Sequence, residues 1–267
     1  MTSARRYFEQ LAEMGERELV IGAEAVGRER GKAEERVDQA GPEASGSPSN
    51  RRTALPALYP PGLSVDAPPP RSDLFSRDPI AECESLEAVA KLARACTKCP
   101  LGHSRTNAVP GEGNPHAGLV CVGEAPGQTE DETGRPFVGR AGQLLDNILR
   151  SIGLERGEVF ICNVLKCRPP NNRTPEPLEV GACSPYLHRQ LELIRPKVIL
   201  ALGKPAANTL LNTQASLGDL RGKVHRYRGI PVVVTYHPAA LLRNPNWKGA
   251  TWDDVRIARR ILDGDTG

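Results

Sequence analysis

Four cysteines are spaced so that together they could hold an inorganic group. Cys96 and Cys99 form a close Cys-Thr-Lys-Cys pair, and Cys167 and Cys183 flank a proline-rich stretch. One close pair and one wide pair of thiolates supply four ligands, which suits either a tetrahedral zinc ion or a four-iron cluster. The spacing does not decide between these two groups, but it indicates that the chain carries inorganic chemistry.

The first of three polar motifs, Gly-Glu-Ala-Pro-Gly-Gln-Thr-Glu-Asp, occupies Gly123–Asp131 and directly follows an apolar run. Gly123 and Gly127 permit a tight turn with exposed backbone N–H groups, and Glu124 would then lie at the rim of a sheet. The motif lacks the Gly-Lys-Ser/Thr ending of a P-loop, so it does not predict a nucleoside triphosphate site. Taken alone, it also fits an ordinary turn after a strand.

The other two motifs also follow apolar runs. Asn163 ends one run, and its planar amide could read the edge of a nucleobase or simply form a turn. His237 follows another run and could polarise or protonate a reacting group. Shortly after it come Leu241 and Leu242. We expect these leucines to project from a loop and enter a partner, unless they fold back into the core.

Together these motifs resemble the family 4 uracil-DNA glycosylases, and the resemblance extends from about Cys96 to Leu262. The segments that carry it are Gly123–Gly127 with Glu130 and Asp131, Gly134–Gly142, Asn163 with Lys166–Pro170, and His237–Arg243. The four cysteines match that family's iron–sulfur ligands in order and spacing, which implies a [4Fe-4S] cluster. The resemblance implies an enzyme that hydrolyses the N-glycosidic bond of uracil in DNA, leaves an abasic site and initiates base-excision repair.

The resemblance also implies which residues bind the base. Because a base inside a duplex is inaccessible, such an enzyme flips the nucleotide out of the helix or accepts single strands. Phe137 would then stack on the uracil, Asn163 would pair with its polar edge, and Ala125 would line the same site. Glu130 would fill the space beside C5 and so exclude the methyl group of thymine.

Catalysis is implied to rest on Glu124 and His237. His237 near O2 would stabilise the departing uracil anion, and Glu124 would either stabilise the sugar cation or orient the attacking water. The residues that the resemblance implies as DNA contacts are Leu241 as a wedge in the gap left by the flipped nucleotide, Leu242, Arg243 and Arg168. The cluster is expected to be structural, and a redox role stays open.

Some related cluster-bearing proteins bind uracil DNA covalently through a histidine between the later cysteines. The corresponding segment here, Arg168–Pro177, contains no histidine, so we expect turnover and not a trapped adduct. Two other classes of protein stay open: a non-catalytic iron–sulfur protein that binds nucleic acid, and an electron-transfer or sensing protein. Neither would need Glu124, Asn163 and His237 together.

Alternating apolar and amphipathic segments predict the elements that position these residues. We expect strands at Gly118–Gly123, Val159–Asn163, Lys197–Leu202 and Ile230–Thr235, and helices at Ser85–Ala95, Gly139–Ile152, Pro175–Ile194, Lys204–Leu211 and Ala250–Leu262. Val/Ile/Leu strands separated by helices are typical of a parallel sheet covered on both faces. We therefore expect a three-layer α/β/α fold with a central four-stranded parallel sheet, like that of uracil-DNA glycosylases. Polar groups at strand ends gather at one edge of such a sheet.

Composition divides the 267 residues into two parts. Residues 1–81 contain 11 Lys/Arg and 13 Asp/Glu, whereas residues 82–267 contain 24 and 19, an excess that is compatible with a polyanionic partner. The first part is rich in Pro, Ser and Gly, so we expect a largely disordered extension with a short helix near 4–19. It could bind a replication or repair protein. The catalytic domain is expected at 82–267.

The start of the chain has no apolar signal-peptide core, and no stretch is long enough to span a bilayer. We therefore expect a soluble cytoplasmic protein with no membrane partner. In that compartment cysteines serve as metal ligands more often than they form disulfides. We expect a monomer that acts on uracil-containing DNA, either single- or double-stranded.

Overall fold

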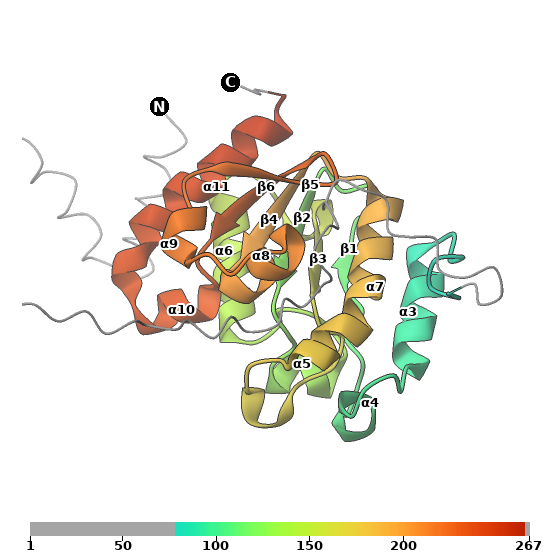
Figure 1. Ribbon diagram of the computed structural model, residues 1–267. Coiled ribbons are helices and arrows are strands. Elements are labelled where there is room, and N and C mark those ends of the chain that lie inside the picture. The colour runs from blue at the N-terminus through green and yellow to red at the C-terminus, as the bar shows by residue number, and fades with distance from the viewer. Residues whose placement is uncertain (1–77, 265–267) are drawn as a thin grey trace, which may run out of the picture. The chain divides into compact units, whose positions relative to one another are not determined.

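The computed structural model describes residues 78–264 (Figure 1). The expected helix near 4–19 and all but the last four residues of the expected extension lie outside the described residues. Residues 78–81 belong to the folded part, because Ile80 is only 1% exposed and lies in the same hydrophobic core as Val89 and Leu187. The folded part therefore begins before residue 82.

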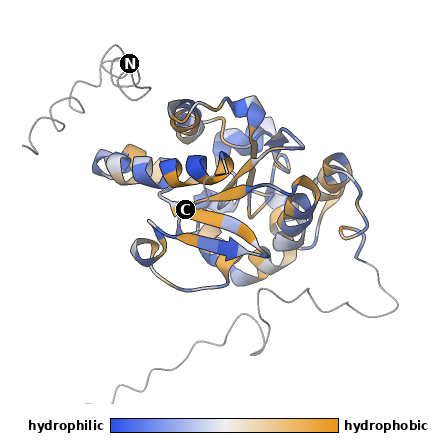
Figure 2. Cartoon of the chain, turned by 90° about the horizontal axis from the view of Figure 1, so that it is seen from above, coloured by the Kyte–Doolittle hydropathy of each residue, from blue (hydrophilic) through white to orange (hydrophobic). Residues whose placement is uncertain are grey.

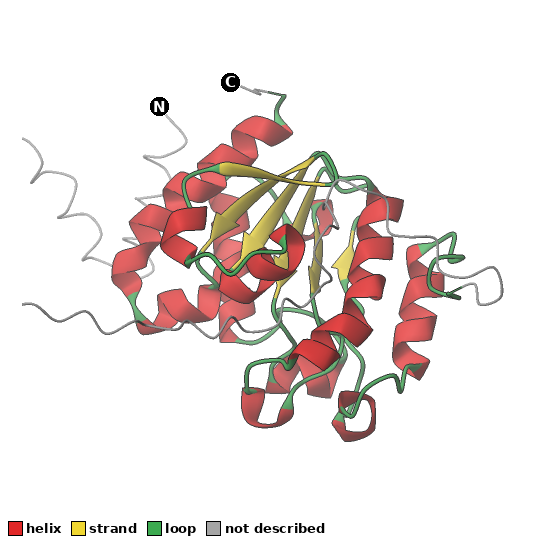
Figure 3. Ribbon diagram, viewed as in Figure 1, coloured by secondary structure: helices red, strands yellow, loops and turns green. Residues whose placement is uncertain are grey.

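A six-stranded mixed sheet lies at the centre of this part (Figure 3). Its spatial order is β1 (Glu112–Gly113), β3 (Phe160–Asn163), β2 (Leu119–Gly123), β4 (Val198–Leu202), β6 (Ile230–Thr235) and β5 (Val224–Tyr227). The four middle strands are parallel to one another, which confirms the expected α/β class and its parallel core. The antiparallel edge strands β1 and β5 were not expected, because one is two residues long and the other alternates with polar residues.

The described helices include five that match the expected ranges to within two residues: α3 (Leu86–Ala95), α6 (Arg140–Ser151), α7 (Pro177–Ile194), α8 (Lys204–Leu211) and α11 (Lys248–Leu262). Shorter helical segments are α4 (Leu101–Ser104), α5 (Gln128–Thr133), α9 (Leu217–Leu220), α10 (Pro238–Arg243), and the turns η2 (Arg156–Glu158), η3 (Pro170–Asn172) and η4 (Pro245–Trp247). Segments this short cannot display a helical hydrophobic period, so the sequence did not predict them. None of the helices in residues 78–264 has the length and apolar character of a membrane span.

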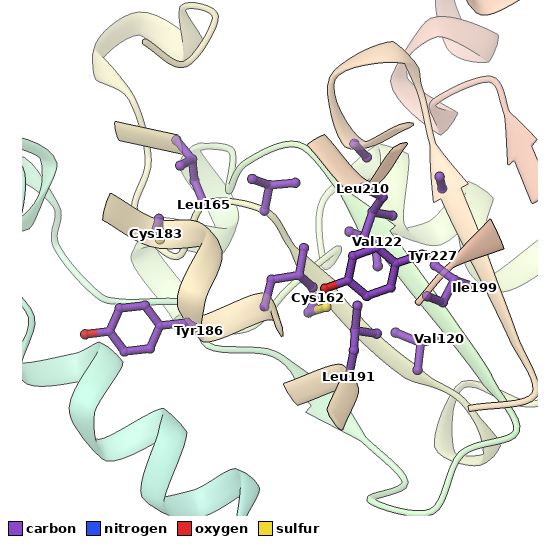
Figure 4. Close-up of a cluster of buried hydrophobic side chains, with 14 of the residues drawn as sticks. Val120, Val122, Cys162, Leu165, Cys183, Tyr186, Leu191, Ile199, Leu210 and Tyr227 are labelled. Carbon is purple, nitrogen blue, oxygen red and sulfur yellow. The ribbon is translucent and has the colours of Figure 1, made fainter. Parts of the chain in front are cut away.

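Two hydrophobic cores cover the two faces of the sheet, and the central strands are correspondingly apolar in Figure 2. Side chains of β2 alternate between them, as the two-residue period of a strand requires. On one face, Val120 packs in a cluster with Leu191 of α7, and Figure 4 shows this cluster. On the other face, Cys121 packs with Leu145 of α6 and Val255 of α11.

The parallel strands end together at one edge of the sheet. Gly123 at the end of β2 is in register with Asn163 at the end of β3, and Leu202 of β4 is in register with Thr235 of β6. The loops that follow these strands therefore leave the sheet side by side. They carry the three polar motifs.

Candidate active site and thiol cluster

A cavity of about 710 Å³ opens among the loops at this edge. Seven of the residues expected in the site line it: Glu124, Ala125, Glu130, Phe137, Asn163, His237 and Arg243. Three expected DNA contacts, Leu241, Leu242 and Arg168, are not among its lining residues. The sheet thus brings side chains from four separate loops around one space.

Gly123 has no side chain, and this leaves room for Asn163 and Phe137 in the cavity wall. A Cβ atom there would lie 2.3 Å from Asn163 Oδ1 and 2.6 Å from Phe137 Cζ, closer than real Cβ atoms approach other atoms. Phe137 itself has a positive φ of 50°, and its backbone carbonyl lies where a Cβ of Gly142 would be. Glycine at these two positions therefore lets the Phe137 ring and the Asn163 amide reach the end of β2.

Asn163 presents an unused acceptor. The residue is 1% exposed, and its Oδ1 atom accepts no hydrogen bond within the described part of the chain. Leaving a buried polar atom unpaired costs about 1–3 kcal/mol. Because Asn163 also lines the cavity, this oxygen is placed to accept a hydrogen bond from a bound molecule.

His237 is held as a neutral hydrogen-bond donor. Its Nδ1 atom accepts a hydrogen bond of 3.1 Å from the backbone N–H of Ala239, so the ring proton lies on Nε2. Burial, with a smaller contribution from the nearby positive charge of Arg243, lowers the pKa of His237 to about 4. Its ring centroid lies 5.5 Å from that of Phe137.

Glu124 follows β2 directly, and its carboxyl group has only partial access to solvent. Burial raises the pKa of this carboxyl above its ordinary value. The backbone oxygen of Glu124 accepts a 3.0 Å hydrogen bond from the N–H of Leu165, which ties the two strand-end loops together. A carboxylate and a neutral imidazole therefore face one cavity, as general acid–base chemistry requires.

Glu130 fastens two loops to each other. Its Oε1 atom accepts hydrogen bonds of 2.9 Å from the N–H groups of both Val138 and Gly139, and its Oε2 atom accepts one of 3.1 Å from the N–H of Gly127. The carboxylate is therefore fixed in the cavity wall beside the start of α6. The sequence suggested only a steric role, since these loop contacts depend on the fold.

The expectation that both leucines project from a loop is wrong for Leu241. The segment is the helix α10, and Leu241 is 1% exposed, whereas Leu242 is 42% exposed. On the opposite lip, Arg168 donates a 2.8 Å hydrogen bond to Asn172, a residue of the cavity wall. Other wall residues that the sequence reasoning missed are Lys204, Tyr236 and Trp247.

The four cysteines Cys96, Cys99, Cys167 and Cys183 line a second, smaller cavity, and none of them forms a disulfide. Three polar N–H groups point at their sulfur atoms. Arg105 donates to Cys167 at 3.0 Å, the backbone N–H of Lys166 donates to Cys183 at 3.1 Å, and that of Lys98 donates to Cys96 at 3.5 Å. N–H donors directed at sulfur are what thiolate ligands of a cluster require.

Within residues 78–264, no three His, Cys, Asp or Glu side chains are grouped so that they could hold a single metal ion. The four thiols instead surround a space between the end of α3, α4, α7 and the loop after β3. Four soft sulfur ligands around a common space fit an iron–sulfur cluster in their chemistry.

The sequence of this chain is similar to those of known proteins. The model of the uracil DNA glycosylase superfamily matches residues 110–256. The chain is 48% identical over 187 residues to a type-4 uracil-DNA glycosylase of Sulfurisphaera tokodaii, covering 67% of this chain and 85% of the relative. It is 50% identical over 180 residues to a type-4 uracil-DNA glycosylase of Pyrobaculum aerophilum, covering 64% and 92%. A type-5 uracil-DNA glycosylase of the same organism is more distant, at 33% over 176 residues, covering 60% and 76%.

Proposed function

Since the chain belongs to the uracil-DNA glycosylase superfamily and groups with its type-4 members, it is a DNA glycosylase that removes uracil from DNA in DNA repair, and we propose how the cavity carries out this reaction. One observation carries the proposal. The Oδ1 atom of Asn163, which is buried and has no hydrogen-bond partner among residues 78–264, faces the same space as the aromatic ring of Phe137 and the neutral imidazole of His237. They match the acceptor, the stacking surface and the donor that a flipped-out uracil needs.

Asn163 selects uracil against cytosine. Its free Oδ1 accepts the N3–H of uracil while the ring of Phe137 stacks on the base. Cytosine has no proton on N3, so two acceptors would face each other in a buried site. An unmatched pair of this kind costs about 1–3 kcal/mol, which corresponds to roughly 5- to 150-fold in selectivity.

Glu130 excludes thymine. Its carboxylate lies in the cavity wall and is held there by three backbone N–H groups, so it cannot swing aside. Thymine differs from uracil only by the C5 methyl group, and a fixed wall rejects this methyl sterically. The three hydrogen bonds are what make the wall rigid.

His237 and Glu124 act on opposite partners of the breaking bond. As the bond between C1′ and N1 breaks, its electron pair leaves with uracil, and the Nε2–H of His237 stabilises the resulting anion at O2. Glu124 faces the sugar, where its carboxylate stabilises positive charge or orients the water that adds to C1′. A neutral imidazole suits its task, because it donates a hydrogen bond without having to be protonated first.

Leu242, and not Leu241, acts as the wedge in duplex DNA. Leu242 is exposed on the same short helix whose N-cap is His237, and it lies five residues after this catalytic group. An apolar side chain that enters the base stack offsets part of the unstacking cost of a few kcal/mol. Arg243 lines the cavity beside it and provides positive charge for a phosphate.

A [4Fe-4S] cluster would be held by Cys96, Cys99, Cys167 and Cys183. When bound, the cluster supplies a rigid covalent connection among distant segments of the chain. The loop after Cys167 includes Pro169, Asn172 and Arg173 of the cavity wall, so fixing its ends also fixes that wall. Iron and acid-labile sulfide in the purified protein, in place of zinc, test this assignment.

The reaction is tested with labelled oligonucleotides that contain one uracil, either single-stranded or opposite guanine or adenine. We expect alkali-labile cleavage at the uracil and none at thymine or cytosine, with much slower cleavage by Glu124→Gln. If folded protein that contains iron and sulfide releases no uracil, the proposed function is wrong.

A further inference from the structure

Trp247 is an exposed aromatic ring on the wall of the active-site cavity. It lies in η4, directly after α10, and is 37% exposed. The other large hydrophobic side chains that are exposed in the described part are Leu178, Val224 and Leu242, none of which is aromatic. An indole ring beside the exit of a DNA-binding cavity needs an explanation that the uracil site does not supply.

The ring is supported from behind. Trp247 stacks on Tyr236 with ring centroids 4.6 Å apart and only 8° between the ring planes. The guanidinium of Arg221 lies 4.4 Å from the centroid of the Tyr236 ring. Because a parallel indole already covers one face of Tyr236, the guanidinium lies on the opposite face. The three groups therefore form a stack with Trp247 at its outer end.

The base of this stack is anchored in the protein interior. Arg221 donates a 2.7 Å hydrogen bond to Oδ2 of Asp254, a residue that is 1% exposed, and the N–H of Gly222 donates to the other carboxylate oxygen at 3.2 Å. Tyr236 immediately precedes His237 in the chain. The position of the stack relative to the catalytic imidazole is thus set by a single peptide unit.

One face of the Trp247 ring is covered by Tyr236, so its exposed area lies on the outer face and edges. Trp247 lines the cavity, whose wall also contains Arg243 and Lys204. A flat apolar ring next to cationic side chains is the arrangement that proteins use to bind unpaired bases, because every base presents an aromatic face whatever its sequence.

We propose that Trp247 is a stacking platform for an unpaired nucleobase that flanks the uracil in single-stranded DNA, an inference that rests on the proposed function. In a duplex the flanking bases stay paired within the helix, and Leu242 fills the gap left by the flipped uracil, so the platform has no unpaired base to accept. In a single strand the flanking base is free and can stack on Trp247 while the uracil occupies the cavity. The platform therefore favours single-stranded substrates.

The test compares binding of two single-stranded oligonucleotides by fluorescence anisotropy. Both contain a deoxyuridine with fluorine on C2′, which withdraws electrons from the sugar and blocks cleavage, and one of them has baseless sugars on both sides of the uracil. We expect the wild-type protein to bind the complete oligonucleotide about 10-fold more tightly, the contribution of one base–aromatic stack. Trp247→Ala should lose this difference, and Trp247→Phe should keep most of it.

Two controls separate stacking from damage to the fold. Val224→Ala removes another exposed apolar side chain, on β5 and outside the cavity wall, and should leave both affinities unchanged. Trp247→Ala should also slow uracil release from single strands more than from duplex DNA. Equal losses by Trp247→Ala on the two oligonucleotides, or on single and double strands, would overturn the platform.

Failure of the platform and failure of the proposed function give different results. If the wild-type protein binds the oligonucleotide with flanking bases more tightly but releases no uracil, the stacking role of Trp247 is supported and the glycosylase function is wrong. If uracil is released but the wild-type protein binds both oligonucleotides equally well, the stacking role of Trp247 is wrong and the glycosylase function is supported.

Discussion

The buried ammonium group of Lys166 donates a 2.7 Å hydrogen bond to the backbone carbonyl oxygen of Asn163. The same Nζ donates at 2.7 Å to Oε1 of Gln190, whose own amide donates at 2.7 Å to the carbonyl of Pro110. Lys166 also lines the thiol cavity, and its backbone N–H donates to Cys183. One residue therefore joins the end of β3 to the cysteine cavity.

Replacing Lys166 by methionine should lower the free energy of unfolding by about 2–4 kcal/mol. The substitution leaves two buried oxygen atoms without a donor, and each unpaired group costs about 1–3 kcal/mol. Denaturant unfolding of the cluster-loaded protein measures the loss. Lys204→Met, at an exposed lysine, is the matched control and should change stability by less than about 0.5 kcal/mol. Equal stability of the two variants would show that the buried hydrogen bonds contribute nothing.

Replacing Asn163 by aspartate should reduce the preference for uracil over cytosine by about 5- to 150-fold. A carboxylate repels the O4 carbonyl of uracil but accepts the amino group of cytosine. The ratio of kcat/KM for matched uracil and cytosine oligonucleotides measures this change. An unaltered ratio in a folded variant would remove Asn163 from base selection.

His237 should make stability depend on pH in a defined window. Burial lowers its pKa from 6.5 to about 4 in the folded protein, so between these values the unfolded chain binds a proton that the folded chain does not. The contribution of His237 to the free energy of unfolding is therefore fully present above pH 6.5 and is lost as the pH falls toward 4. We expect the wild type to lose about 2 kcal/mol more than His237→Gln across this window. Parallel curves of unfolding free energy against pH would contradict the assignment.

The two neighbouring leucines of α10 should respond to alanine in opposite ways. Leu241→Ala leaves a cavity in the core and should cost about 2–5 kcal/mol of stability. Leu242→Ala removes an exposed side chain, so it should leave stability nearly unchanged and slow uracil release from duplexes more than from single strands. Thermal unfolding and paired kinetic measurements separate these effects. The wedge role fails if Leu242→Ala affects both kinds of substrate equally.

Removal of residues 1–77 should leave the isolated reaction nearly intact, because the sheet, the cavity and the cysteines all lie beyond them. Removal of residues 1–81 should destabilise the protein by about 2–5 kcal/mol more, since it deletes the buried side chain of Ile80. Melting temperatures and uracil release by the two truncated chains test this boundary. Equal melting temperatures would place the boundary at residue 82 after all.

The sequence predicted the parts of the fold that depend on local patterns. The parallel strands were recognisable because buried strands are continuously apolar, and Glu124, Asn163 and His237 could be placed at their ends. The helix α10 was not recognisable, because six residues are too few for a period, and so the burial of Leu241 was missed. Short segments take their conformation from what they pack against.

The missed site residues depend on contacts between distant parts of the chain. Lys166 belongs to a segment that carries the family resemblance, but no sequence pattern predicts that its side chain is buried, because only the packing of α7 against the loop after β3 buries it. The Trp247 ring is supported only because it stacks on Tyr236, whose ring in turn contacts Arg221. Neither role leaves a signal in spacing or composition.

The positive φ of Phe137 has a consequence for when conformational entropy is lost. Arg156 donates to the carbonyl oxygen of Phe137 at 3.1 Å, and the absent side chains at Gly123 and Gly142 leave space for its ring and backbone. The ring is therefore immobilised when the chain folds and not when DNA arrives. Under the proposed function, an incoming base would meet an aromatic ring that is already held in place, so binding would not have to supply the conformational entropy of ordering that ring.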